Sequence, residues 1–152
     1  MRAMDSSGTH LWLVLMKAHR TLERHARRSI EPLDLGISDF AILELLLHRG
    51  PQPVNAIGRR VDLTSGAITT AVDRLETKGF VARSFDADDR RTRTVSLTPK
   101  GTARIREVFG HHKGAMDHAA GGLTKAERET LINLIKKLGR TAEQYLGKEE
   151  ES

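Results

Sequence analysis

The sequence predicts a mainly α-helical fold with a single β-hairpin, and three observations support this prediction. Apolar residues recur at spacings of three and four through most of the chain, which is the period of an amphipathic helix. Between residues 80 and 97 the period changes to two, as expected for strands. Proline, glycine and Ser/Thr residues divide the helical part into four segments before the hairpin and two after it. Three short helices followed by a hairpin make a winged helix-turn-helix.

The first predicted helix covers residues 9–33 and is amphipathic. Pro32 and Gly36 mark its end. Its apolar stripe consists of Leu11, Leu15, Ala18, Leu22, Ala26, Ile30 and Leu33.

Two short helices are predicted next, and both belong to the winged helix-turn-helix. Ser38 with Asp39 is expected to cap the first, FAILELLLHRG, which stops at Gly50-Pro51. Pro53 is expected to begin the second, PVNAIGRRVD.

The third short helix has the features of a helix that enters a DNA major groove. Thr64 caps it, and Gly79 stands just past its last turn. Ser65 and the threonines can bond base edges or phosphates, and Gly66 allows a close approach. The same pattern also fits an ordinary surface helix. Its inward face carries Ile68, Val72 and Leu75, and its outward face carries Gly66, Thr70, Asp73 and Thr77, flanked by Thr69 and Arg74.

The predicted hairpin carries opposite charges at its tip, in the 86–92 loop. An arginine at such a tip can reach into a minor groove, where narrow A·T-rich DNA concentrates negative potential. The carboxylates of Asp88 and Asp89 are expected to pair with Arg74, Arg90 or Arg93 and to stiffen the wing. The alternative is a solvated loop of mixed charge. The charged residues of the loop are Asp86, Asp88, Asp89, Arg90 and Arg91, and Arg93 follows it directly.

Two more helices are predicted after the hairpin. Thr98-Pro99 opens the first, and Gly121-Gly122 breaks it. Thr124 with Glu127 forms a capping box at the start of the second. The apolar stripe of the last helix consists of Leu131, Leu134, Ile135, Leu138, Ala142 and Tyr145.

Composition narrows the class of protein further. The 152 residues carry a net charge of +5 with a pI of about 9.9, which favours polyanionic partners. There are no cysteines, so disulfides, thiolate zinc sites and thiol redox sensing are excluded. No apolar run is long enough to span a membrane, and no secretory signal is recognisable, so a cytoplasmic protein is expected. No nucleophile elbow, P-loop or GxGxxG motif is present, so an enzyme is not expected and no cofactor is predicted.

The segment LTSGAITTAVDRLETKGFVARSFDADDRRTRTVSLTPKG resembles the signature region of the MarR regulators. The matching elements are Asp89-Arg90-Arg91 in the wing, Leu97-Thr98-x-x-Gly101 after it, and the run from Asp73 to Gly79. The resemblance extends over the whole chain, including SDFAILELLLHRGPQPVNAIG. Within the family, the pattern is most similar to the branch that answers hydroquinones and other phenolics.

The resemblance implies a homodimeric regulator, usually a repressor, that binds a pseudo-palindromic double-stranded DNA operator. One domain over residues 1–152 would comprise a winged helix-turn-helix lobe (34–100) and dimerisation helices (9–33 and 101–147). Arg91 would enter the minor groove, and Arg74 would contact phosphate or brace the wing. The family's peroxide sensors need a reactive cysteine, which this chain lacks. The predicted DNA-binding residues are Thr64, Ser65, Gly66, Thr69, Thr70, Arg74, Arg90, Arg91 and Arg93.

Two competing functions stay open at the level of sequence. A winged-helix module could bind protein rather than DNA; a DNA-binding protein should keep Arg83, Arg90, Arg91 and Arg93 on the face of Thr69 and Thr70. A metal-responsive regulator of the same fold is the other. His111 and His118 are seven residues apart rather than the four typical of zinc-responsive members, so no metal site is predicted.

A crevice for a small aromatic or phenolic effector is predicted between the first helix, the fifth helix and the winged lobe. The same residues also suit plain packing of a dimer interface. The candidate walls are Trp12, Met16, Phe40, Leu43, Phe109 and His112.

Overall fold

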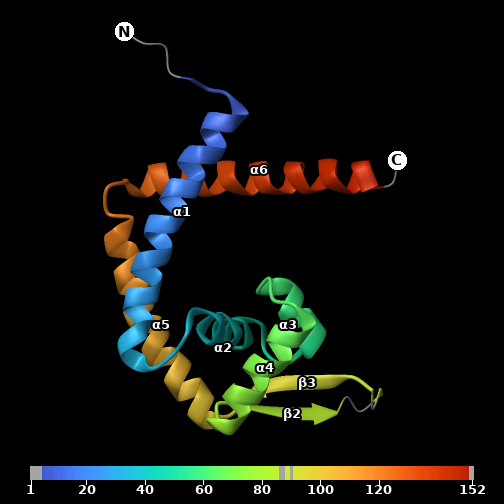
Figure 1. Cartoon of the computed structure of the whole chain (residues 1–152). Coiled ribbons are helices and arrows are strands. Elements are labelled where there is room, and N and C mark those ends of the chain that lie inside the picture. Colours follow the sequence, from blue (N-terminus) through green and yellow to red (C-terminus); the bar gives the residue numbers. More distant parts are fainter. Residues whose placement is uncertain (1–4, 86–87, 90, 151–152) are drawn as a thin grey trace. The chain divides into compact units, whose positions relative to one another are not determined.

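The structure is a computed structural model that describes residues 5–85, 88–89 and 91–150 (Figure 1). The described chain contains six α-helices, one 3-10 helix and three strands, so the predicted order of four helices, a hairpin and two helices is confirmed. It divides into two compact units, Met1–Met116 and Asp117–Ser152. The elements are α1 (Gly8–Ile30), η1 (Glu31–Leu33), α2 (Ile37–Arg49), β1 (Gln52–Pro53), α3 (Val54–Arg60), α4 (Ser65–Thr77), β2 (Val81–Phe85), β3 (Arg93–Leu97), α5 (Pro99–Ala119) and α6 (Lys125–Glu150).

Helix α1 begins after Ser7, whose side chain accepts a hydrogen bond from the backbone N–H of His10. Pro32 follows the helix in η1, and Asp34 then turns the chain with a φ of 55°. The predicted helix over residues 9–33 therefore corresponds to α1 followed by the η1 turn.

The predicted cap of α2 is wrong. Gly36 is the N-cap residue, with no side-chain hydrogen bond, and Asp39 lies inside the first turn. Asp39 is 3% exposed and its carboxylate accepts hydrogen bonds from Nε and Nη2 of Arg74, at 3.0 and 2.5 Å. A buried carboxylate needs such a partner, and this one lies on another helix rather than at the helix terminus.

The predicted boundaries of α4 are confirmed. The Thr64 hydroxyl accepts a hydrogen bond from the N–H of Ala67 at 3.2 Å, which satisfies one free donor of the first turn. Gly79 ends the helix with a φ of 77°, a conformation that glycine adopts without strain. The buried face consists of Ile68, Ala71, Val72 and Leu75.

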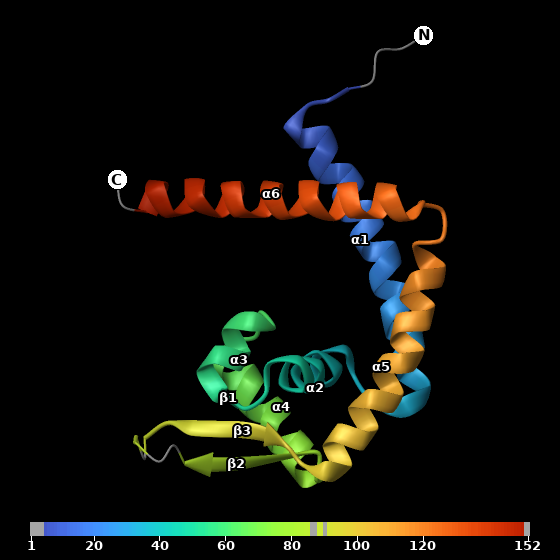
Figure 2. The same ribbon diagram turned by 180° about the vertical axis from the view of Figure 1, so that it is seen from behind.

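The wing is a three-stranded antiparallel sheet in the order β1-β3-β2 (Figure 2). The two long strands pair over their whole length, from Val81↔Leu97 to Phe85↔Arg93. The short strand β1 pairs with β3 through Gln52↔Val95 and was not predicted. A strand of two residues that contains a proline has no alternating pattern to recognise.

The base of the wing is tied to the start of α5. The backbone N–H of Thr98 donates to the carbonyl of Phe80 at 3.0 Å, and its hydroxyl donates to the carbonyl of Gly79 at 2.6 Å. The same hydroxyl accepts from the N–H of Gly101 at 3.0 Å. Thr98 therefore joins the end of α4, the start of β2 and the first turn of α5.

The hydrophobic core lies in the unit Met1–Met116. Side chains from α2, α3, α4, the wing and α5 fill it, so α4 and the wing pack on one common core. Its buried members are Ile30, Leu35, Phe40, Ile42, Leu43, Leu46, Ile57, Ile68, Ala71, Val72, Leu75, Val81, Val95, Ile105 and Val108.

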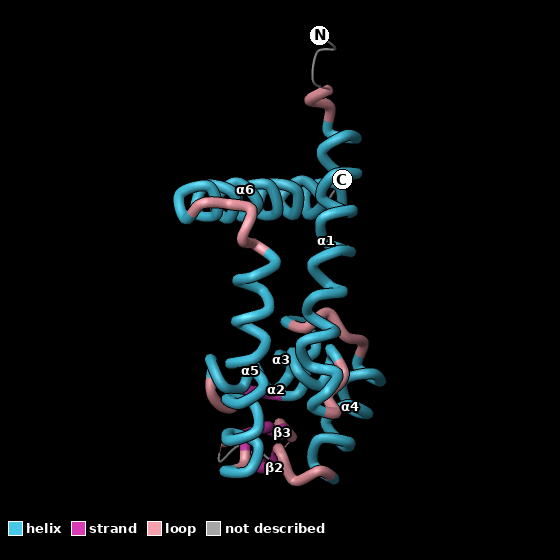
Figure 3. Tube along the Cα trace, turned by 90° about the vertical axis from the view of Figure 1, so that its left-hand side faces the viewer, coloured by secondary structure: helices cyan, strands magenta, loops and turns pink. Residues whose placement is uncertain are grey.

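Helices α1 and α5 meet within this unit (Figure 3). The Ser29 hydroxyl donates to the carbonyl of Ala26 at 2.6 Å. Its oxygen also lies 3.1 Å from Nδ1 of His112, within hydrogen-bond distance. His112 thus links α5 to α1.

The second unit consists mainly of α6, whose predicted capping box is confirmed. Glu127 accepts hydrogen bonds from the N–H and hydroxyl of Thr124, at 2.8 and 3.0 Å. These bonds hold the pKa of the Glu127 carboxyl below its usual value. In the described part of the chain, no helix is both long and apolar enough to cross a membrane.

Candidate nucleic-acid interface

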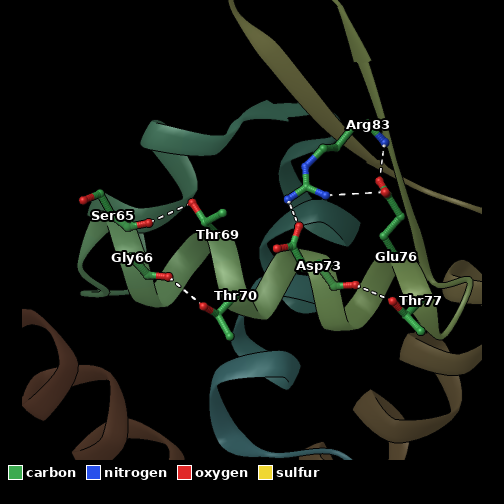
Figure 4. Close-up of polar contacts among 8 residues, drawn as sticks. All are labelled: Ser65, Gly66, Thr69, Thr70, Asp73, Glu76, Thr77 and Arg83. Atoms are coloured by element: carbon green, nitrogen blue, oxygen red, sulfur yellow. Dashed lines mark hydrogen bonds and ion pairs between the residues drawn. The ribbon is translucent and has the colours of Figure 1, made fainter.

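Helix α4 presents small polar side chains to solvent (Figure 4). Thr69 Oγ1 donates to the carbonyl of Ser65 at 2.9 Å, and Thr70 Oγ1 donates to that of Gly66 at 3.0 Å. Thr77 makes the same bond to Asp73, at 2.9 Å. Because each hydroxyl proton is used within the helix, the oxygen lone pairs remain as acceptors on the exposed face.

The wing is clamped onto α4 by Arg83, whose side chain is 15% exposed. Its guanidinium lies 2.6 Å from the Asp73 carboxylate and 3.5 Å from that of Glu76 (Figure 4). The backbone N–H of Arg83 also donates to Glu76 at 3.2 Å. Arg83 therefore neutralises the acids of α4 and fixes the angle between helix and wing. Its charge is not free for a ligand.

A groove of about 570 Å³ lies between α3, α4 and the wing. Four arginines line it, and three of them, Arg59, Arg91 and Arg93, are not tied to the acids of α4 as Arg83 is. Among the described residues no carboxylate lines the groove, so its lining is positively charged. Arg59 comes from α3, and the other three arginines, Arg83, Arg91 and Arg93, lie on the wing. The groove is lined by Val54, Asn55, Gly58, Arg59, Leu63, Ser65, Ile68, Thr69, Arg83, Arg91, Thr92 and Arg93.

Asp89 holds the wing turn in shape. Its carboxylate accepts from the backbone N–H of Arg91 at 2.9 Å and from the hydroxyl of Thr92 at 3.1 Å. Asp89 was predicted to pair with an arginine side chain, but its described bonds are to the Arg91 backbone and the Thr92 hydroxyl, and they fix the turn that carries Arg91. Asp88 is exposed in the same turn, and the predicted contact residue Arg90 lies outside the described residues.

Arg74 does not brace the wing. Its guanidinium binds Asp39 of α2 instead, and these hydrogen bonds raise the pKa of Arg74. Its side chain keeps 45% of its surface exposed. Its main contact is therefore a bridge between α2 and α4, which corrects the predicted pairing with the wing carboxylates.

The predicted effector residues divide into two groups. The rings of Phe40 and His112 lie 4.6 Å apart, and Phe109 meets His48 at 5.0 Å. Leu43 is fully buried in the same core. Trp12 is 58% exposed and lies seventeen residues before Ser29 on α1, or about 25 Å along the helix. Met16 is four residues closer.

The structure therefore does not bring Trp12 and Met16 to the Phe40–His112 pair within one protomer. The sequence pattern could place all six residues on their helices, but it could not show that the length of α1 separates Trp12 and Met16 from the other four. Among the residues described, no three His, Asp or Glu side chains gather in a way that could hold a metal ion.

Sequence reasoning missed two groove residues, Asn55 and Arg59, which both lie on α3. They are four residues apart and so share one face of the helix. The spacing predicts that these two side chains share a face of α3, but it identifies that face as part of the groove only when the wing is known to lie opposite α3.

A helix-turn-helix beside a cationic wing, with a groove that arginines line, is typical of the class of winged-helix proteins that bind DNA. Comparison with known proteins agrees. The MarR family model matches residues 35–92. The HTH-type transcriptional regulator MhqR of Bacillus subtilis (strain 168) is 34% identical over 145 residues, which is 95% of this chain and 100% of that protein. The chain belongs to the MarR family of transcriptional regulators, which are not enzymes.

Solved structures give the same result. A cysteine-to-serine mutant of MarR from E. coli, in complex with operator DNA, matches with a TM-score of 0.76 at 25% identity, over 84% of this chain and 92% of that one. A structure of Bordetella bronchiseptica BpsR, whose DNA binding is regulated by 6-hydroxynicotinic acid, matches with a TM-score of 0.77 over 86% of this chain and 98% of that one. At 24% identity, the second match supports the fold alone.

Proposed function

We propose that this protein is a homodimeric repressor that binds a pseudo-palindromic operator and is released from it by a small aromatic effector. The observation that carries the DNA-binding part is the groove between α3, α4 and the wing, which brings Arg59, Arg91 and Arg93 together with the hydroxyls of Ser65 and Thr69. Phosphates bind such a cationic surface, and the adjoining α4 face carries the groups that read base edges. The experiment that tests it is selection of an operator from random duplex DNA with the purified protein.

Arg91→Ala is expected to weaken binding to the selected operator by roughly 1–3 kcal/mol, the scale of one good groove contact. Arg91 is exposed on the wing turn, so its loss leaves the fold intact. Fluorescence anisotropy titrations at several salt concentrations provide the measurement, with a log–log slope of roughly −0.9 expected per phosphate contacted.

Arg106→Ala is the charge-matched control, because Arg106 is exposed on α5 and does not line the groove. Equal affinities for the two variants would contradict the minor-groove role of Arg91. A wild-type slope near zero would favour the protein-binding winged-helix module.

The dimer is supported by exposed apolar side chains in both units. Leu11, Trp12, Leu13 and Val14 of α1 are each at least half exposed. Helix α6 exposes a second set: Leu131, Ile132, Leu134, Ile135 and Leu138. So many exposed large apolar side chains on two helices favour an interface, and a second copy of the chain is the occupant we propose.

Replacing Leu131 and Leu138 together with glutamate is expected to convert the dimer to monomers. These residues lie on one stripe of α6, and two carboxylates there would have to be desolvated in the interface. Sedimentation at micromolar concentration measures the outcome. Lys136→Glu changes the net charge by the same amount on the opposite face of α6 and should leave the dimer intact. Wild-type protein that sediments as a monomer would exclude the dimer.

We place the effector near the Phe40–His112 pair, where α1, α2 and α5 meet. Support comes from the BpsR relative, whose DNA binding is regulated by a hydroxylated aromatic acid. A phenol or aromatic acid could stack on these rings and bond a polar edge such as His112. A hydroquinone-type effector, as the sequence resemblance implies, has the same chemistry.

His112→Leu is expected to raise the effector concentration needed for operator release, because it removes the polar group beside Phe40 that we propose as the effector's partner. A tenfold release at saturation requires about 1.4 kcal/mol of coupling between effector and operator. The measurement is release of labelled operator by a panel of phenols and aromatic acids. His111→Leu changes the exposed neighbouring histidine and serves as the control. Identical potencies in both variants would place the effector elsewhere.

A further inference from the structure

Phe85 is an exposed aromatic residue at the end of β2, with 63% of its surface open to solvent. It pairs directly with Arg93 of β3. The guanidinium carbon of Arg93 lies over the ring, 5.5 Å from its centroid, within the range of a cation–π contact. The positively charged guanidinium of Arg93 therefore covers one face of the exposed ring.

The sheet register shows which way this pair faces. Arg83 pairs with Val95, and Phe85 pairs with Arg93 two residues further along, so all four side chains share one face of the hairpin. Val95 is fully buried on this face, and Arg83 binds the acids of α4 there. Phe85 and Arg93 extend the same face toward the wing tip.

Arg93 also lines the cationic groove, together with Thr69 of α4. Within residues 5–85, 88–89 and 91–150, no carboxylate forms an ion pair with it. Among the described residues its guanidinium therefore contacts the ring of Phe85 rather than a carboxylate, and this contact leaves its N–H donors available to an incoming phosphate.

We infer that Phe85 is a positioning residue for DNA binding, which holds the Arg93 guanidinium over its ring so that the arginine meets a backbone phosphate already ordered. The inference rests on the proposed function. A free arginine loses side-chain freedom when it binds, and a stacked one has lost part of it beforehand. The ring adds no hydrogen bond that could compete with the phosphate.

The test uses the operator selected by wild-type protein and compares three substitutions at position 85. Phe85→Leu keeps an apolar side chain but removes the π face, and is expected to weaken operator binding about two- to fivefold, the value of one exposed cation–π contact. Phe85→Trp keeps the strongest π face and should bind at least as well as wild type. Phe85→Tyr should also match wild type.

A double-mutant cycle separates positioning from direct contact. Arg93→Ala removes the cation, so adding Phe85→Leu to it should cost nothing further. Melting temperatures of the single variants should match that of wild type, because both side chains are exposed. This agreement shows that affinity, rather than folding, has changed.

Two results would overturn the inference alone: wild-type affinity in Phe85→Leu, or an equal loss from Phe85→Leu with and without Arg93. The second result would mean that the ring acts without the arginine. Wild-type protein that selects no operator would overturn the proposed function, and this inference with it.

Discussion

Gly101→Ala should lower the free energy of unfolding by at least about 3 kcal/mol, near the upper range for single substitutions that overfill a core. A Cβ at this position would lie 1.9 Å from the carbonyl oxygen of Phe80 and 2.7 Å from its carbonyl carbon. Both atoms belong to backbone, so no side chain can rotate aside. The start of α5 would have to separate from the wing, which breaks the hydrogen bonds of Thr98.

Gly110→Ala is the matched control on the same helix. Nothing lies within 4 Å of its added Cβ, and alanine in a helix interior is favoured over glycine by roughly 0.5–1 kcal/mol. Urea denaturation of the two variants should therefore show effects of opposite sign. If Gly101→Ala were as stable as wild type, the close approach of α5 to Phe80 would be disproved.

Arg74→Ala is expected to cost about 2–3 kcal/mol of stability, because it leaves the buried Asp39 carboxylate without its partner. The expected loss is below that of a fully enclosed pair, since 45% of the Arg74 side chain is exposed and water can replace part of it. Denaturation in urea measures the change, and operator affinity is measured on the folded fraction.

A second substitution tests the cause. Asp39→Asn removes the buried charge, so in the Arg74→Ala background it should recover part of the lost stability. No recovery would mean that the cost arises from packing of the arginine stem. If Arg74→Ala were as stable as wild type, the Arg74–Asp39 pair would not stabilise the fold, and a contact with DNA would be the remaining role for Arg74.

Most helices could be predicted because their boundaries are local. Thr64, Gly79, Thr124 and Glu127 act on backbone groups within a few residues, so the sequence alone places them. Asp39 has the same chemistry as a capping residue. Its actual partner is Arg74, thirty-five residues away, and a local pattern cannot distinguish the two uses.

The candidate interface was predictable to a similar extent. The outward face of α4 follows from helical period and is observed, and the wing arginines line the same groove as Thr69. Arg83 was expected among the DNA-facing charges, but it forms ion pairs with two carboxylates of α4. Its role depends on the angle between wing and helix, which the core sets and no single segment encodes.

The ion pairs of Arg83 hold α4 and the wing turn at a fixed separation. The helix can probe bases, and the turn can probe an adjacent groove, while Asp73 and Glu76 keep the distance between them constant. Because the protein holds this separation, the DNA must deform to meet both contacts. Base pairs between the two contacts would be selected by how readily they bring the groove to that distance, although no side chain touches them.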